Sequence, residues 1–82
     1  MEYIAFTSTQ LASALKGRRK ALGLRQKDVA ARVGLLQKTV SALESSPERC
    51  SVDSLQRLMA ALELEFVLRP KNEPDAVRTQ EW

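Results

Sequence analysis

The sequence predicts a mostly α-helical domain of four to five helices followed by one C-terminal β-strand, and three observations lead to this prediction. Apolar residues recur at helical spacing in four stretches between residues 8 and 62. Between residues 64 and 69 the spacing changes to alternation, the period of a half-buried strand. The chain has 82 residues, enough for one small domain whose core is only marginal alone, so a second copy is expected to stabilise it.

The first helix is expected to open at a capping box of Thr7 and Gln10 and to end at Gly23. The second starts at Arg25 or Gln26 and ends at Gly34, because glycine takes the positive φ of a sharp turn without steric cost. The apolar residues that these two helices are expected to bury are Leu11, Leu15, Leu22, Val29, Ala30 and Val33.

The third helix is expected to run from about Leu36 to Ser45. At about 100° per residue, one side of this helix is apolar and the opposite side is small and polar, as a helix that enters a DNA groove requires. The apolar side carries Leu36, Val40 and Leu43, and the opposite side carries Lys38, Ser41, Ala42 and Ser45.

A fourth helix is expected after the loop at Pro47, with Ser51 as its N-cap. Residues 64–69 then form the predicted strand, whose two edges would be unpaired in a single chain. If the strand pairs with the same strand of a second copy across a two-fold axis, backbone groups at its edge gain hydrogen-bond partners and a homodimer forms. A strand at residues 3–6 is the weaker alternative partner. The apolar residues of the fourth helix are Leu55, Leu58, Met59 and Leu62.

We divide the chain into a folded unit, residues 1–69, and a C-terminal tail, residues 70–82. The tail has two prolines, mixed charge and few apolar residues, a composition that does not offset the entropy lost on ordering. It is expected to be flexible and to end in an exposed Trp82. One large aromatic residue on a flexible tether can enter a pocket of a partner protein and supply much of the local binding energy.

The charge of the chain is unevenly distributed. Residues 1–43 contain eight basic and two acidic side chains, a formal charge of +6, whereas residues 44–82 contain five basic and eight acidic ones, a formal charge of −3. A basic half suits a polyanion, and an acidic half suits a protein contact or solubility. Charge alone does not choose between nucleic acid and a membrane surface.

Catalysis, cofactors and metal binding find little support in the residue types. The chain has no histidine, no glycine-rich phosphate loop and no cluster of ligands at metal spacing, and its single cysteine, Cys50, excludes an intrachain disulfide. The N-terminus lacks the pattern of a signal peptide, and no apolar run approaches the roughly 20 residues of a membrane span. We therefore expect no enzyme, no metal, no cofactor and no membrane partner, and a cytoplasmic location.

Two short amphipathic helices joined by a glycine turn in a basic stretch are typical of a helix-turn-helix that reads double-stranded DNA. Gln26 begins a helix and is expected to donate to phosphate, while Gln37 and Lys38 are expected to reach base edges in the major groove. Ser41 either contacts DNA or allows close approach of the backbone. Lys27, like Arg32, is either a DNA contact or ordinary surface charge.

The residues of this segment resemble those of the Cro/cI-type helix-turn-helix domains over about residues 8–62. The resemblance implies a helical DNA-binding domain in which Arg19 and Glu44 form an internal ion pair. Many members have Ser or Thr where this chain has Leu36, so the usual cap of the recognition helix is missing. Leu36 either packs into the core, as its angular position favours, or contacts a thymine methyl group. The matching residues are Leu22, Gly23, Leu24, Gln26, Ala30, Gly34, Gln37, Val40, Ser41 and Glu44.

Features outside this motif resemble the HipB antitoxins of bacterial toxin–antitoxin operons. They are the start TSTQLASALKGRRKALG, the late strand LELEFVLRP and the polar tail that finishes in Glu81 and Trp82. The resemblance implies a homodimeric repressor that binds an inverted-repeat operator and neutralises a HipA-like serine/threonine kinase toxin, with Trp82 at the contact with the toxin. The alternatives are a free-standing Cro/cI-type regulator of phage or restriction–modification type, and a protein-interaction adaptor that reads no DNA.

Overall fold

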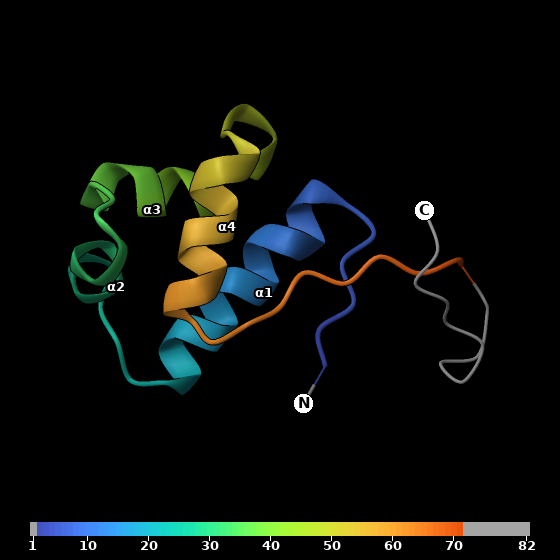
Figure 1. Cartoon of the computed structure of the whole chain (residues 1–82), viewed down its shortest axis with the longest axis horizontal. Helices are drawn as coiled ribbons and strands as arrows, with labels where there is room; N and C mark the ends of the chain where they lie inside the picture. Colours follow the sequence, from blue (N-terminus) through green and yellow to red (C-terminus); the bar gives the residue numbers. More distant parts are fainter. Residues whose placement is uncertain (1, 72–82) are drawn as a thin grey trace.

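The structure is a computed structural model that describes residues 2–71. These residues form four α-helices, α1 (Ser8–Ala21), α2 (Gln26–Val33), α3 (Gln37–Leu43) and α4 (Val52–Ala61), and one 3₁₀ turn, η1 (Pro47–Arg49). In Figure 1, α2 and α3 lie to the left of α4, and most of α1 lies to its right. The α2 helix packs against both α3 and α4. The η1 turn contacts both α1 and α3. The predicted mostly helical fold is confirmed.

The ends of the helices follow the predicted local signals. The Gln10 backbone N–H donates to Thr7 Oγ1 at 3.1 Å, and the Thr7 N–H donates to Gln10 Oε1 at 3.2 Å, which completes the capping box. Ser51 caps α4 by accepting the Ser54 N–H at 3.0 Å. Gly34 ends α2 with φ at +70°, so the sharp turn before α3 has the left-handed backbone that the sequence predicted.

One of the two expectations for Leu36, that it packs into the core on the apolar side of α3, is wrong. The helix begins at Gln37, so Leu36 is its N-cap, with φ −83° and ψ 150°, and the side chain is 62% exposed. A helical wheel assumes helical backbone at every position and therefore fails at this extended residue. Leu35 packs against the core in its place.

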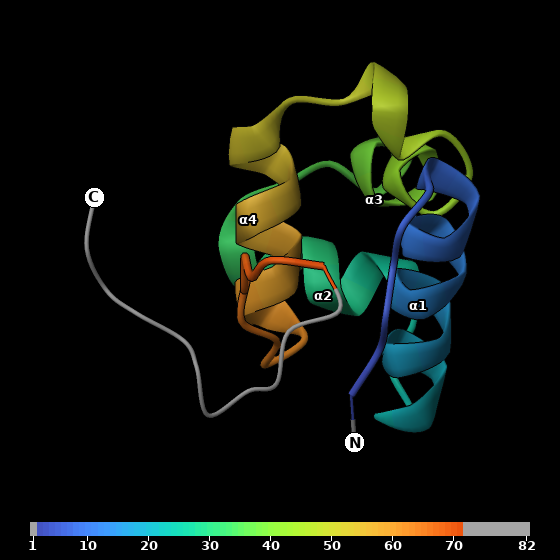
Figure 2. The same ribbon diagram turned by 90° about the vertical axis from the view of Figure 1, so that its right-hand side faces the viewer.

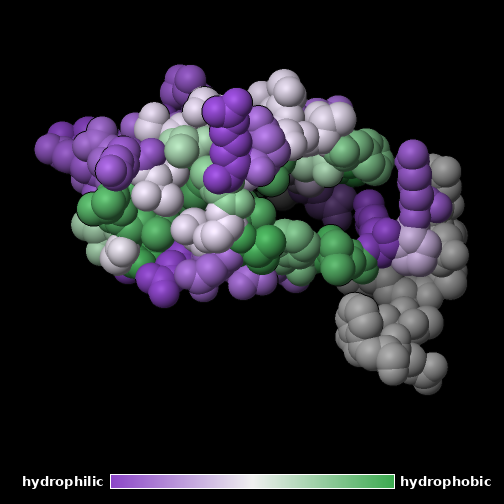
Figure 3. Space-filling view, turned by 90° about the horizontal axis from the view of Figure 1, so that it is seen from above, coloured by the Kyte–Doolittle hydropathy of each residue, from purple (hydrophilic) through white to green (hydrophobic). Residues whose placement is uncertain are grey.

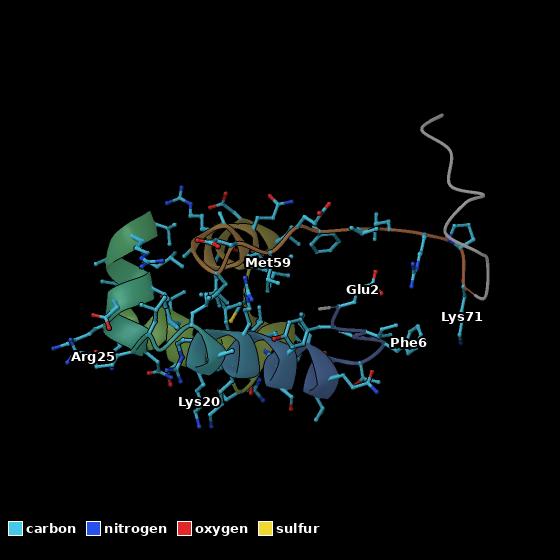
Figure 4. All side chains as sticks on the ribbon, turned by 90° about the horizontal axis from the view of Figure 1, so that it is seen from below. Glu2, Phe6, Lys20, Arg25, Met59 and Lys71 are labelled. Carbon is cyan, nitrogen blue, oxygen red and sulfur yellow. The ribbon has the colours of Figure 1, made fainter. Side chains whose placement is uncertain are left out.

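The core lies where the four helices meet, and its buried residues were largely predicted. Met59 of α4 is one of them, and Figure 4 shows its side chain between α1 and α4. The largest side chains that are almost fully buried are Leu15, Leu43, Leu58, Leu62, Val29 and Val40. Four further predicted core residues, Leu11, Leu22, Val33 and Leu55, are partly buried against this cluster.

Two arginines stabilise the C-terminal end of α4. Arg18 Nε donates to the Leu62 carbonyl oxygen at 2.9 Å, and Arg32 Nη1 donates to the Ala61 carbonyl oxygen at 3.4 Å. Cations are favourable there because the last carbonyls of a helix lack intrahelical partners and carry partial negative charge. This internal contact was not among the two roles considered for Arg32, which remains exposed on α2.

Both terminal segments of the described chain lack regular secondary structure and extend to one side of the helices (Figure 1). Residues 64–70 form no strand with any other part of residues 2–71, so the predicted strand remains a prediction about a second copy. The N-terminal segment leads away from the start of α1 in Figure 1 and lies in front of α1 in Figure 2. Lys71 Nζ lies 5.5 Å from the centre of the Phe6 ring. Trp82 and the rest of the predicted tail beyond residue 71 lie outside the described residues. No helix within residues 2–71 has the length and apolar character to cross a membrane.

Gly17 provides a test of the helical assignment. It lies in the middle of α1, and a Cβ built there meets no atom within 4 Å. We expect Gly17→Ala to raise the free energy of unfolding by about 0.5–1 kcal/mol, because alanine loses less backbone entropy in a helix. Urea unfolding followed by circular dichroism measures this change. Gly23→Ala is the matched control, since its φ of +73° should make the same substitution destabilising.

Candidate nucleic-acid interface

The helix-turn-helix of α2 and α3 is held to α1 by a buried ion pair. Arg19 Nε donates to Glu44 Oε2 at 2.6 Å, and Arg19 Nη2 donates to Oε1 at 3.1 Å. The two side chains are only 11% and 3% exposed. Arg19 Nη1 also donates to the Leu24 carbonyl oxygen at 2.8 Å, in the loop between α1 and α2. The ion pair that the resemblance implied is confirmed, and its bidentate geometry fixes the end of α3 relative to α1.

Gln26 joins this network from the first position of α2. Its Nε2 donates to Glu44 Oε1 at 3.1 Å, and the residue is half-buried. This contact was not predicted, because Gln26 and Glu44 are 18 residues apart and nothing in the local pattern indicates it. One amide N–H of Gln26 is directed to the protein, so its side chain has a defined orientation beside the free N–H groups of the α2 N-terminus.

The other predicted DNA-binding residues are on the surface of α2 and α3. Gln37 and Lys38 form the first turn of α3, directly after the exposed Leu36. Ser41 is one turn further along and is also exposed, and Lys27 is exposed in the first turn of α2. The structure therefore leaves these five side chains accessible to a ligand that lies along α3.

A second ion pair lies on the exposed start of α2. Arg25 Nε donates to Asp28 Oδ2 at 3.1 Å, and this hydrogen bond holds the pKa of the Asp28 carboxyl below its ordinary value of 3.8. A lowered pKa contributes stability that is present above that ordinary value and is lost as the pH falls through the value in the folded state. The negative Asp28 in the first turn also complements the helix dipole.

Further basic side chains lie at the end of α1 and at the start of α2. Figure 4 shows Lys20 and Arg25 projecting outward, away from the end of the molecule where Phe6 and Lys71 meet. Within residues 2–71, no group of three or more His, Cys, Asp or Glu side chains is placed to hold a metal ion. The residues of α2 and α3 combine positive charge at Lys27 and Lys38 with the amide groups of Gln26 and Gln37, a combination that suits a polyanion.

Comparisons with known proteins agree with this geometry. A helix-turn-helix family model matches residues 15–68. Antitoxin HipB from one Escherichia coli strain is 35% identical over 81 residues, covering 94% of this chain and 86% of the relative. This chain belongs to the HipB antitoxin family of helix-turn-helix proteins. Antitoxin HipB from a second Escherichia coli strain is 32% identical over 63 residues and covers 77% of this chain and 72% of its own length.

Solved structures of HipB have the same fold. A chain of the HipA–HipB–O2–O3 complex superimposes with a TM-score of 0.80 at 29% identity, over 84% of this chain and 97% of that one. A chain of the HipB–O4 20mer complex gives the same TM-score, identity and coverage. The HipB resemblance inferred from the sequence is thus confirmed over nearly the whole domain.

Proposed function

We propose that this protein is an antitoxin that also represses transcription from its own toxin–antitoxin operon. The observation that carries the proposal is the 35% sequence identity with antitoxin HipB, in an alignment that covers 94% of this chain. The exposed polar start of α3 and the oriented Gln26 at α2 support the DNA-binding half of it. The protein would act in the cytoplasm, where it meets both its operator and its toxin.

In this proposal two copies of α3 enter successive major grooves of double-stranded DNA. Gln37 and Lys38 read base edges, glutamine by a bidentate pair with adenine and lysine by donation to guanine. Gln26 and Lys27 contact phosphates and set the register, and Ser41 lets the helix backbone approach the DNA. Two-fold symmetry predicts an inverted repeat whose half-sites are about 34–36 Å apart.

The dimer is proposed to form at an apolar groove opposite the DNA-binding face. This groove, of about 1280 Å³, is lined by both terminal segments and by α1 and α4, and Figure 3 shows a hollow beside apolar residues. A lone monomer would expose the apolar side chains that line this groove to water. The strand at residues 64–69 would pair with its copy in the partner and cover the groove. The large apolar side chains exposed in the two terminal segments are Ile4, Phe6, Phe66, Val67 and Leu68.

The DNA-binding half is tested with the double variant Gln37→Ala, Lys38→Ala. The probe is a duplex recovered by the full-length protein from a random library, and anisotropy measures its dissociation constant. Each lost base contact is expected to cost about 1–3 kcal/mol of binding free energy. Both residues are exposed, so stability should change by less than about 0.5 kcal/mol.

Gln56→Ala, an exposed residue of α4, is the control and should bind as the unmodified protein does. Sedimentation of the unmodified complex should give two chains per duplex. Unchanged affinity in the double variant would remove Gln37 and Lys38 from the interface. If the full-length protein recovers no duplex from the library, the adaptor alternative, in which this fold reads no DNA, is favoured.

The antitoxin half is proposed to act by binding and neutralising a HipA-like serine/threonine kinase, with Trp82 inserted into a pocket of the toxin. The solved HipA–HipB–O2–O3 complex supports a HipA-like partner for a chain of this family. Calorimetry with a HipA-like kinase compares the full-length protein, Trp82→Ala and the tail control Val77→Ala. Loss of an anchoring aromatic residue is expected to cost about 2 kcal/mol or more, roughly 30-fold in affinity.

One observation favours a second candidate, a regulator without a toxin. An uncharacterised helix-turn-helix transcriptional regulator of Sinorhizobium fredii is 32% identical over 92% of this chain, although this chain spans only 38% of that protein. If the full-length protein binds operator DNA and no HipA-like kinase, this alternative replaces the antitoxin. A protein truncated after Arg69 would then retain all its activity.

A further inference from the structure

Leu36 breaks a local rule at the start of α3. The N-cap position of a helix favours Ser, Thr, Asp or Asn, whose side-chain oxygen accepts one of the unpaired N–H groups of the first turn. Leu36 makes no such hydrogen bond, and its side chain is not buried in compensation, since 62% of it is exposed. Departures from local rules are expected at positions that serve function.

The surroundings of Leu36 indicate which function this is. The other large exposed apolar side chains of residues 2–71 lie in the two terminal segments, apart from Val52 at the start of α4. Leu36 is instead followed directly by the exposed Gln37 and Lys38. A single apolar side chain beside hydrogen-bond donors does not resemble a protein-binding patch, which needs a contiguous apolar area.

The same combination matches the major groove of DNA. Each base pair presents donors and acceptors there, and thymine alone adds an apolar group, its 5-methyl. We propose that Leu36 contacts the 5-methyl group of a thymine in each operator half-site, next to the bases read by Gln37 and Lys38. This inference rests on the proposed operator binding and adds a requirement for thymine at one symmetric position.

Replacing thymine by uracil isolates the methyl group, because the base pair and its hydrogen bonds are unchanged. The probe is a duplex recovered from a random thymine-containing library, resynthesised with uracil at each thymine position in turn, in both half-sites. Losing one buried methyl is expected to weaken binding about fourfold per half-site, or roughly fifteenfold for the dimer. We expect that loss at one position only.

Variants of Leu36 link the loss to this side chain. Leu36→Ala should bind the thymine duplex about as weakly as the unmodified protein binds the uracil duplex, and should no longer distinguish the two. Leu36→Met keeps an apolar side chain and should still distinguish them. Val52→Ala removes an apolar side chain of similar exposure, 64%, and should leave the discrimination unchanged.

Each outcome supports or overturns the proposal. A position at which uracil weakens binding by the unmodified protein and not by Leu36→Ala supports it. If uracil costs nothing at any position, or if Leu36→Ala discriminates as well as the unmodified protein, the contact is wrong while operator binding stands. If the protein recovers no duplex from the library, operator binding fails and this proposal fails with it. Thermal melts of each variant show whether it is folded.

Discussion

Arg19→Ala is expected to lower the free energy of unfolding by about 3–5 kcal/mol, because it leaves a buried carboxylate without its charged partner. Glu44 is 3% exposed and accepts two hydrogen bonds from Arg19. After the substitution only the neutral amide of Gln26 would still donate to it. Small domains have about 5–15 kcal/mol of stability in total, so the variant should be near the limit of folding at 25 °C.

Urea unfolding at neutral pH measures this loss, and the matched control is Arg57→Ala. The ion pair of Arg57 with Asp53 is also formed through Nε, at 3.1 Å, but the two side chains are 52% and 73% exposed. Exposed pairs contribute about 0–1 kcal/mol, so burial is the main difference between the two tests. Losses of equal size would mean that the buried pair contributes no more than a surface pair.

The same network would join stability to the proposed DNA contact of Gln26. Glu44 receives donors from α1 and from the first residue of α2 while it ends α3, so one carboxylate sets the mutual position of three helices. Gln26 is oriented by a group that cannot move without disturbing the core. A protein that reads DNA with two helices needs this rigidity, because a displaced side chain loses its hydrogen bond to the base or phosphate.

Features that depend on neighbouring residues could be predicted from the sequence. The capping box of Thr7 and Gln10, the cap at Ser51 and the left-handed Gly34 each follow from residue types within a few positions. The buried faces of the helices follow from spacing. The Arg19–Glu44 pair spans 25 residues, and only resemblance to a known family indicated it before the structure.

Other features could not be predicted because they depend on distant residues or on a backbone conformation. Arg18 and Arg32 reach the end of α4 across 44 and 29 residues, and no spacing rule links such positions. The helical spacing predicts Leu36 on the core side, but Leu36 precedes the helix and its backbone is extended, so the spacing does not apply to it. The strand predicted at residues 64–69 would pair only with a second chain, so the structure of a single copy does not test it.

Operator binding is expected to fall about 10³–10⁵-fold between roughly 50 and 200 mM salt, if each dimer makes about 6–10 phosphate contacts. The structure narrows the set of basic residues that are available to contact phosphates. Three of the eight basic residues in the N-terminal half, Arg18, Arg19 and Arg32, donate to groups within the protein, and Arg25 pairs with Asp28. The other four are the exposed lysines Lys16, Lys20, Lys27 and Lys38.

Lys38 is proposed to read bases, so the lysines left for phosphates are Lys16, Lys20 and Lys27. A dimer presents two copies of each, which is the lower end of the assumed range of phosphate contacts. Anisotropy titrations at several salt concentrations give the slope of log affinity against log salt. Lys27→Ala should reduce the slope by about two per dimer and weaken binding to all sequences alike. Gln37→Ala should change sequence preference and leave the slope intact, because an uncharged side chain releases no counterion from the DNA. A flat salt response would contradict binding dominated by phosphates, and equal slopes for Lys27→Ala and the unmodified protein would remove Lys27 from the interface.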